Sequence, residues 1–289
     1  MNGILLIDKP PDWTSNDVVA KLKGILHQRR IGHSGTLDPM ATGLLVVFVG
    51  RATRAVEFAE GHDKRYLAGL RLGVNTDTQD ITGTVLEEKP GSVSREALEN
   101  ALAAFRGEIQ QIPPMYSAIK CNGQRLYDIA RKGGEVERSP RTVTIHELRL
   151  VGEQEGNWLL DVSCSKGTYI RTLCHDLGQA LGCGGCMSSL RRVRAGQFSV
   201  DEAVTLAQVQ QMAGEGRAEE LLLPVDSLFR QLPQWTAGAA QEKKIRCGNP
   251  VKTGLADGDY RVYGESGEFL MLGRVEAGLM KTVKSFFEV

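Results

Sequence analysis

Regular hydrophobic spacing divides the chain into short strands and helices. Alternating or continuous apolar positions predict strands over residues 3–8, 44–49, 64–72, 141–151, 158–164 and 187–198. Helical spacing predicts helices that begin near Ser15, Ser94, Gly167 and Thr205. Shorter helices are expected over 51–60 and 126–132. Paired prolines exclude a regular helix within 108–125, so this stretch is predicted to be a loop that could cover a site.

The pattern changes near residue 231. Short apolar runs follow one another there, separated by regularly placed glycines at 248, 254, 258, 264, 267 and 273. Such punctuation is typical of a small β-barrel. We therefore expect a first domain over residues 1–230 and a second over 231–289.

Residues 32–45 form the most distinctive polar stretch. Asp38 lies between three glycines and a proline, and the stretch continues directly into the apolar strand 44–49. Glycine permits backbone angles that other residues resist, while Pro39 biases Asp38 towards an extended conformation. The loop is therefore predicted to present a carboxylate, although an ordinary Asp-Pro turn explains an isolated Asp38 equally well.

Composition describes an ordinary globular protein. The chain has 289 residues, of which 42% are hydrophobic and 24% charged. Its first residues contain only a short apolar run, followed by Asp8 and Lys9, so a secretory signal or membrane span is not expected. We expect a cytoplasmic location.

Neither the cysteines nor the acidic turns predict a metal site. The six cysteines are scattered, and the Cys183-Gly-Gly-Cys186 spacing lacks the second pair of ligands that a zinc site needs. The polar turn 75–83 resembles the start of a calcium loop, but Asp80 stands where such a loop needs glycine. We expect reduced thiols and no bound metal.

Charge is balanced overall but clustered locally. There are 35 basic and 35 acidic residues, so composition alone does not indicate a nucleic-acid partner. Basic clusters could line one groove if the fold joins them, or could be separate solvated faces; they lie at 29–30, 64–65, 125–132, 138–141 and 191–194. Arg171, in the first turn of a predicted helix, opposes the helix dipole, so either an acidic partner or a surface position is expected for it.

Several motifs in fixed order resemble one family. The pattern GHxGTLDPxAxGxL is complete from Gly32 to Leu45. It is accompanied, in order, by Asp8-Lys9-Pro10, Lys64-Arg65-Tyr66, Leu72-Gly73 with Thr76-Asp77-Thr78, Pro114-Met115-Tyr116-Ser117-Ala118, Gly167-Thr168-Tyr169-Ile170-Arg171-Thr172-Leu173 and Ser188-Ser189-Leu190-Arg191-Arg192. Together they resemble the TruB family of tRNA pseudouridine synthases. One position departs from the pattern, because Asp12 stands where the family commonly has glycine.

The resemblance implies a fold and an activity. The fold would be α+β, with a central mixed, mainly antiparallel sheet flanked by helices and loops, and a small C-terminal PUA-like β-barrel. The reaction would isomerise uridine 55 in the T loop of tRNA to pseudouridine, without cofactor or metal. The partner would be the T stem-loop of tRNA, with no membrane, no obligatory protein partner and a monomeric enzyme. The alternative is a non-catalytic tRNA-binding or folding factor with the same fold.

The resemblance also implies residue roles. Asp38 would be the nucleophile or an electrostatic partner of the sugar, paired with Arg171, which would lower the pKa of Asp38. Tyr66 would stack on the flipped base and serve as a base, while His33 would fill the space that the base leaves. Supporting roles fall to Lys9 and Leu190. Phosphate contacts are expected from the basic strand 190–194, including Arg191, and from Lys64 and Arg65.

Overall fold

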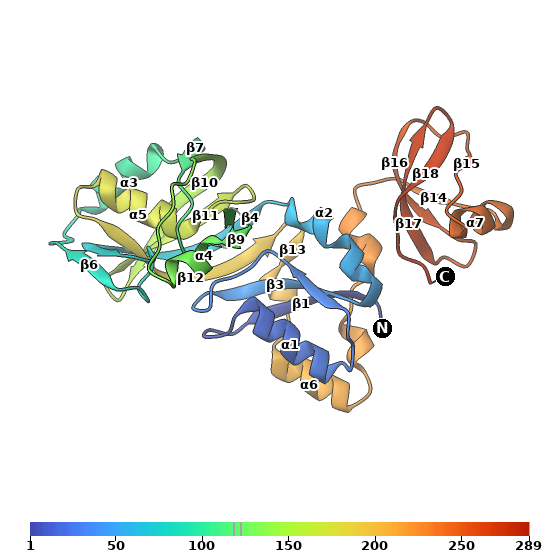
Figure 1. Cartoon of the computed structure of the whole chain (residues 1–289), viewed down its shortest axis with the longest axis horizontal. Helices are drawn as coiled ribbons and strands as arrows, with labels where there is room; N and C mark the ends of the chain where they lie inside the picture. Colours follow the sequence, from blue (N-terminus) through green and yellow to red (C-terminus); the bar gives the residue numbers. More distant parts are fainter. Residues whose placement is uncertain (118, 122, 289) are drawn as a thin grey trace.

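A mixed β-sheet runs through the larger part of the molecule. The computed structural model describes residues 1–117, 119–121 and 123–288 (Figure 1). The sheet has the order β1-β3-β12-β4-β11-β10-β7, with β2 beside β3 and β13 beside β12. Only the β3–β12 pairing is parallel among these described strands. The bounds are β1 (Gly3–Lys9), β2 (Ile31–Ser34), β3 (Thr42–Val49), β4 (Lys64–Leu72), β7 (Gly107–Gln111), β10 (Arg141–Gln154), β11 (Asn157–Cys164), β12 (Gly185–Ala195) and β13 (Phe198–Ser199).

Helices cover different faces of the two halves of this sheet. Helices α1 (Ser15–Ile25) and α6 (Leu206–Gly214) pack on one face of β1 and β3. Helices α3 (Arg95–Ala103) and α5 (Ile170–Ala180) pack on the half formed by β4, β11 and β10. The short helices η1 (Gly50–Ala55) and α2 (Val56–Glu60) contribute to a third core. No helix within the described ranges has the length and apolar character needed to cross a membrane.

Capping residues begin several helices where the sequence predicts them. Thr14 caps α1, and Ser94 caps α3 by accepting a hydrogen bond from the Ala97 amide. Capping boxes are present at the short helix η2 (Val200–Glu202) and at the start of α6. Cap chemistry therefore fixes the start of these elements locally.

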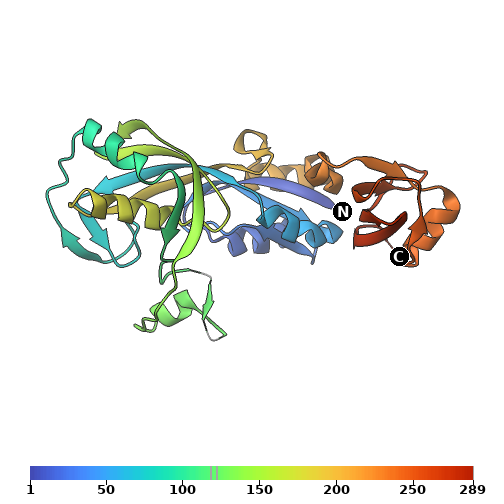
Figure 2. The same ribbon diagram turned by 90° about the horizontal axis from the view of Figure 1, so that it is seen from above.

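Smaller elements project from the main sheet. The hairpin of β5 (Val74–Thr76) and β6 (Val85–Glu88) lies at one end. The segment that contains β8 (Lys120–Cys121), β9 (Gln124–Arg125) and α4 (Leu126–Ala130) stands away from the sheet (Figure 2). Strand β7 lies within the stretch predicted to be a loop. It is an edge strand paired only with β10 in the described sheet, and it is mostly polar and exposed, so its pattern was weak.

A second, smaller sheet lies near the C-terminus. Its order is β14-β16-β17-β18-β15, which confirms the expected change to short strands. The strands are β14 (Gln234–Thr236), β15 (Val251–Lys252), β16 (Gly258–Tyr263), β17 (Phe269–Glu276) and β18 (Leu279–Ser285). Helix α7 (Ala239–Arg246) was not predicted, because Ile245 is its only buried side chain among the described residues. The short helices η3 (Ala218–Leu221) and η4 (Val225–Phe229) precede this sheet.

An aromatic cluster joins the C-terminal sheet to the rest of the chain. Phe229 packs edge-on against Phe58, with ring centroids 5.3 Å apart, and Phe269 stacks on Phe286 at 5.2 Å. Beside the rings, the Arg54 guanidinium donates a hydrogen bond to the Ser285 carbonyl at 3.0 Å. Phe229 also packs against Phe269 at 6.2 Å, so the rings form one contact between the C-terminal sheet and the segment before it.

Gly43 marks the point where β3 meets β12. Its φ is +95°, and a Cβ at this position would lie 2.9 Å from the Arg192 amide nitrogen and closer still to the Arg192 carbonyl oxygen. Backbone atoms cannot move aside without breaking the pairing of the two strands. Only glycine therefore fits at the end of the Asp38 loop.

Gly43→Ala is expected to lower the free energy of unfolding by about 2–4 kcal/mol, because it adds both backbone strain and a backbone clash. The control is Gly24→Ala in α1, where a Cβ meets nothing within 4 Å. That change should be neutral or stabilise by up to about 1 kcal/mol. Urea unfolding of both variants measures the difference, and equal effects would show that the close approach at Gly43 does not constrain the loop.

Candidate active site

Asp38 and Arg171 form an ion pair between a loop and a helix. Asp38 lies in the loop between β2 and β3, and Arg171 in the first turn of α5. The Arg171 Nε is 3.0 Å from Asp38 Oδ2, and its Nη2 is 3.3 Å from Oδ1. This forked geometry fixes the plane of the carboxylate. The structure thus supplies the acidic partner that the position of Arg171 required.

Arg171 is held by further acceptors. Its guanidinium is buried and donates to the Thr78 carbonyl at 3.1 Å and to the Tyr116 carbonyl at 2.7 Å. Its Nη1 also lies 3.7 Å from Asp80 Oδ2. Because acceptors surround the guanidinium, the side chain has little freedom to leave Asp38.

Asp80 is a site residue that the sequence analysis missed. Its carboxylate is buried and accepts hydrogen bonds from the Thr78 hydroxyl at 2.9 Å and the Thr82 hydroxyl at 2.6 Å. The signal was present in the spacing Thr78-x-Asp80-x-Thr82, which lets neighbouring hydroxyls bind a carboxylate locally.

The pKa of Asp38 is raised overall, although Arg171 lowers it as expected. Loss of hydration is the main cause, and the nearby Asp80 charge raises the pKa further, while Arg171 and Lys9 lower it. The side chain still exposes 34% of its surface, so a substrate can reach it. The charged partner of Asp38 could be predicted from the sequence, but the extent to which Asp38 is desolvated could not.

Tyr66 and Leu190 lie on the same face of the sheet as the Asp38 loop. Both are buried and belong to one hydrophobic cluster with Leu37 and Ile170. Burial raises the pKa of Tyr66, so the phenol is protonated at neutral pH. The arrangement offers a flat ring and an aliphatic side chain beside a carboxylate.

Lys9 binds backbone carbonyls in and around the Asp38 loop. Its side chain is fully buried, and its ammonium donates to the carbonyls of Pro10 at 2.8 Å, Trp13 at 2.6 Å and Pro39 at 3.0 Å. Burial lowers the pKa of Lys9 to about 8. All three donors are used within the protein, so the geometry favours a positioning role over direct contact with RNA.

His33 precedes the loop on β2. Its Nδ1 is buried and has no hydrogen-bond partner among the described residues. Burial, with the Arg192 charge, lowers the pKa of His33, so the ring is neutral at pH 7. A neutral ring can enter a gap in a folded RNA loop more cheaply than a charged one.

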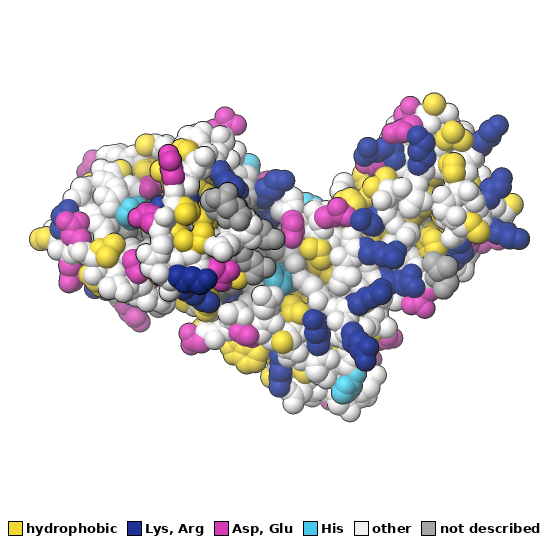
Figure 3. Space-filling model, viewed as in Figure 1, with side chains coloured by type: hydrophobic (Ala, Val, Ile, Leu, Met, Phe, Trp, Pro, Cys, Tyr) yellow, Lys and Arg dark blue, Asp and Glu magenta, His cyan; other side chains and the backbone are white. Residues whose placement is uncertain are grey.

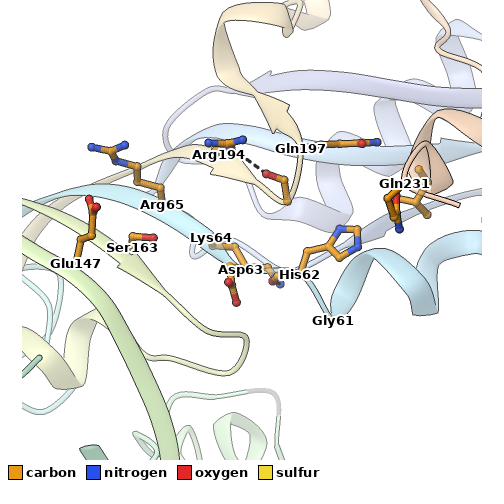
Figure 4. Close-up of a pocket in the computed structure, with 12 residues that line it drawn as sticks. Gly61, His62, Asp63, Lys64, Arg65, Glu147, Ser163, Arg194, Gln197 and Gln231 are labelled. Carbon is orange, nitrogen blue, oxygen red and sulfur yellow. Dashed lines mark hydrogen bonds between the residues drawn. The ribbon is translucent and has the colours of Figure 1, made fainter. Parts of the chain in front are cut away.

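The residues expected to contact phosphate differ in the partners that they have within the protein. Lys64 donates to the carbonyls of Glu60 and His62, whereas Arg65 forms a forked pair with Asp161. Arg191 pairs with Asp8 at 2.8 Å and is 40% exposed. Figure 4 shows Lys64 and Arg65 with Arg194 around a hollow of about 640 Å³, whose lining does not include Asp38.

Phosphate contacts were expected from the whole basic strand 190–194, and for Arg192 this expectation was wrong. Its side chain is 1% exposed, so it cannot reach a phosphate on the surface. Leu190 and Arg192 are two residues apart on β12, and both side chains are buried. The other arginines of this strand, at 191 and 194, keep partial or full exposure.

The described residues do not suggest a metal centre. Within them, no group of three His, Cys, Asp or Glu side chains is arranged to hold an ion. Cys183 and Cys186 are buried free thiols, and burial raises the pKa of Cys186 to about 11.

Comparisons with known proteins identify the class. The profile of the TruB family pseudouridylate synthase N-terminal domain matches residues 23–170, and that of the tRNA pseudouridylate synthase B C-terminal domain matches residues 171–230. The chain belongs to the TruB family of pseudouridylate synthases.

Curated relatives agree with the family profiles. The chain is 46% identical to tRNA pseudouridine synthase B of Aromatoleum aromaticum, over 96% of this chain and 89% of that protein. It is 42% identical to tRNA pseudouridine synthase B of Escherichia coli, over 96% of this chain and 92% of that protein.

Solved structures share the fold. A Cbf5-Nop10-Gar1 complex contains a chain with a TM-score of 0.75 and 26% identity, covering 99% of this chain and 85% of that one. An archaeal Nop10-Cbf5 complex gives a TM-score of 0.72 at 25% identity, covering 99% and 86%. The expected fold class, including the small C-terminal β structure, is confirmed.

The raised pKa of Asp38 is directly measurable. In a carbon-13 NMR titration of the free protein, the Asp38 carboxyl should titrate above the ordinary aspartate pKa of 3.8. Asp80→Asn should move that titration to lower pH, because it removes a neighbouring negative charge. Asp77→Asn, in the same turn but absent from the charges that act on Asp38, should leave it unchanged; an Asp38 pKa at or below 3.8 in the wild type would contradict this account.

Proposed function

We propose that this protein isomerises uridine 55 in the T loop of tRNA to pseudouridine. The observation that carries the proposal is the forked Arg171–Asp38 pair, partly open to solvent and flanked by Tyr66 and Leu190. Membership in the TruB family supports the reaction type, and the names of the relatives support tRNA as the substrate. No metal, cofactor or obligatory protein partner is invoked, and we propose a cytoplasmic monomer.

The reaction exchanges one bond for another. The N1–C1′ bond breaks, the uracil turns, and a C5–C1′ bond forms; the C5 proton leaves and N1 takes up a proton, so the overall composition is unchanged. Ionised Asp38 acts at C1′, either as a nucleophile or by stabilising positive charge on the sugar. Both roles need the carboxylate to be ionised and held in place, and Arg171 favours both conditions.

The surrounding side chains suit a flipped base. Extracting the base from the T loop costs a few kcal/mol, which stacking and hydrogen bonds in the site must offset. Tyr66 and Leu190 offer an aromatic and an aliphatic surface, and neutral His33 can fill the gap left in the RNA loop. The protonated Tyr66 hydroxyl can donate a hydrogen bond to the base, and it can accept a proton only after it has given up its own.

Basic side chains outside the site suit the RNA backbone. Figure 3 shows Lys and Arg side chains gathered where the main sheet and the C-terminal sheet meet. Arg29, Arg30 and Arg54 are exposed in the segments before and after β3. We propose that these side chains, with Lys64, Arg65 and Arg191, follow the T stem-loop. We also propose a catalytic domain over 1–230 and a compact RNA-binding domain over 231–289.

The alternative function is a non-catalytic tRNA-binding or folding factor. The same basic surface would serve it, but such a factor has no need of a buried arginine fork around Asp38. Activity at a single uridine separates the two functions.

Tritium release tests the proposed reaction. A tRNA transcript labelled with tritium at uridine C5 should lose label from position 55 with the wild type, because isomerisation expels the C5 proton. Asp38→Asn should bind the transcript but release label at least about 10³-fold more slowly, and a transcript with cytidine at position 55 should release none. Binding by the wild type without release would support the folding-factor alternative.

Arg171→Lys separates positioning from binding. Lysine keeps the charge but cannot form the fork, so the single-turnover rate should fall by about 10²-fold or more. The Kd for tRNA should stay within about 3-fold, since Arg171 is buried beneath the site. The measurements are rapid-quench tritium release and filter binding, and a rate equal to that of the wild type would remove the fork from the mechanism.

A further inference from the structure

Arg192 is a buried cation without an acidic partner among the described residues. It ranks with Lys9 among the largest fully buried side chains, and no carboxylate within the described chain lies within 4.0 Å of it. Burying a charge in this way is costly unless its donors are satisfied. The positions of those donors therefore indicate what the side chain does.

The guanidinium binds both ends of the Asp38 loop. Its Nη2 donates to the Gly35 carbonyl at 2.9 Å, and its Nε donates to the Leu44 carbonyl at 2.7 Å. Gly35 precedes Asp38 by three residues, and Leu44 follows it by six. One side chain thus fixes the distance between the points where the loop leaves β2 and enters β3.

Arg192 also contacts the strand that carries Tyr66. On β12 it pairs with Gly43 of β3 on one side and with Tyr66 of β4 on the other. Opposite residues of neighbouring strands place their side chains on one face, so the Arg192 and Tyr66 side chains lie on the same face, and the Arg192 charge lowers the pKa of Tyr66 against the effect of burial. The same guanidinium therefore binds the Asp38 loop and acts electrostatically on the Tyr66 phenol.

We propose that Arg192 is a positioning residue for the reaction, which holds both ends of the Asp38 loop beside Tyr66 from inside the sheet. This inference rests on the proposed function, because it assigns Arg192 to the same site. It also separates Arg192 from its neighbours Arg191 and Arg194, whose guanidinium groups remain accessible.

The inference predicts a loss of rate without a loss of RNA affinity. In Arg192→Lys, the single-turnover rate at saturating tRNA should fall by about 10²-fold, because lysine cannot bind both loop ends together. The Kd for tRNA should stay within about 3-fold, with an unchanged salt dependence. A phosphate contact would instead raise the Kd and reduce the salt slope by about one, which would overturn the inference.

A spectroscopic signal distinguishes positioning from structural support. With tyrosine labelled at carbon-13 ζ, and the Tyr66 signal assigned by Tyr66→Phe, the Tyr66 phenol should titrate at higher pH in Arg192→Lys than in the wild type. The physical reason is that lysine cannot keep its charge where the guanidinium lies beside the phenolate, so a favourable charge interaction weakens. If Arg192 only supports the fold, the melting temperature falls while the Tyr66 titration and the rate per folded molecule stay unchanged, and the inference is wrong.

Arg261→Lys is the matched control. Arg261 is mostly buried, donates to the Leu232 carbonyl at 3.0 Å and lies away from Asp38 in β16. Arg261→Lys should lower the melting temperature without changing the rate or the Tyr66 signal.

The two proposals can fail separately. If the wild type releases no tritium, the proposed function is wrong, while the Tyr66 titration in the free protein still supports or overturns the inference about Arg192. Arg192→Lys keeps the positive charge and most of the volume, so the test does not depend on a variant that leaves a cavity.

Discussion

The structure depends on how a short loop is held around Asp38. Three buried polar side chains from distant parts of the sequence bind its backbone. Ser15 exchanges hydrogen bonds with both the amide and the carbonyl of Leu37, Lys9 binds the Pro39 carbonyl, and Arg192 binds the loop at both ends. Each stabilises a backbone group next to the carboxylate, so the loop does not need to become ordered when a substrate arrives.

The charges around the loop are balanced in a similar way. Arg171 lies between two carboxylates, one belonging to Asp38 and the other to Asp80. Desolvation and Asp80 raise the pKa of Asp38, whereas Arg171 lowers it, so the carboxyl is less acidic than an exposed aspartate yet keeps a fixed cationic partner. A carboxylate that is poorly hydrated and firmly oriented is better suited to act on a sugar carbon than one that water surrounds.

Much of the fold could be predicted from the sequence, because its core strands and helices have clear apolar periodicity. The exceptions have physical reasons: β7 is a polar edge strand, and α7 has little buried surface. Glycine spacing and Pro39 also predicted that Asp38 lies in a shaped loop. These signals are local, so a single chain is enough to detect them.

The site was harder to predict where burial decides the chemistry. The expected partner of Asp38 was found, but the direction of its pKa depends on three-dimensional crowding. Arg192 looked like part of a basic surface, although strand alternation places it on the same face as Leu190, which is the core face. For a basic cluster in a strand, it is therefore necessary to establish which face of the sheet each side chain lies on before RNA contacts are predicted for it.

Amide hydrogen exchange of the loop tests the central claim most directly. Peptides that cover residues 35–44 should exchange slowly in the free protein, since the Leu37 amide is bound to Ser15 and the Ala41 amide to the Asp38 carbonyl. Addition of tRNA should change their exchange little. Fast exchange in the free protein that becomes slow only with tRNA would contradict the claim that the loop is held in place before the substrate binds.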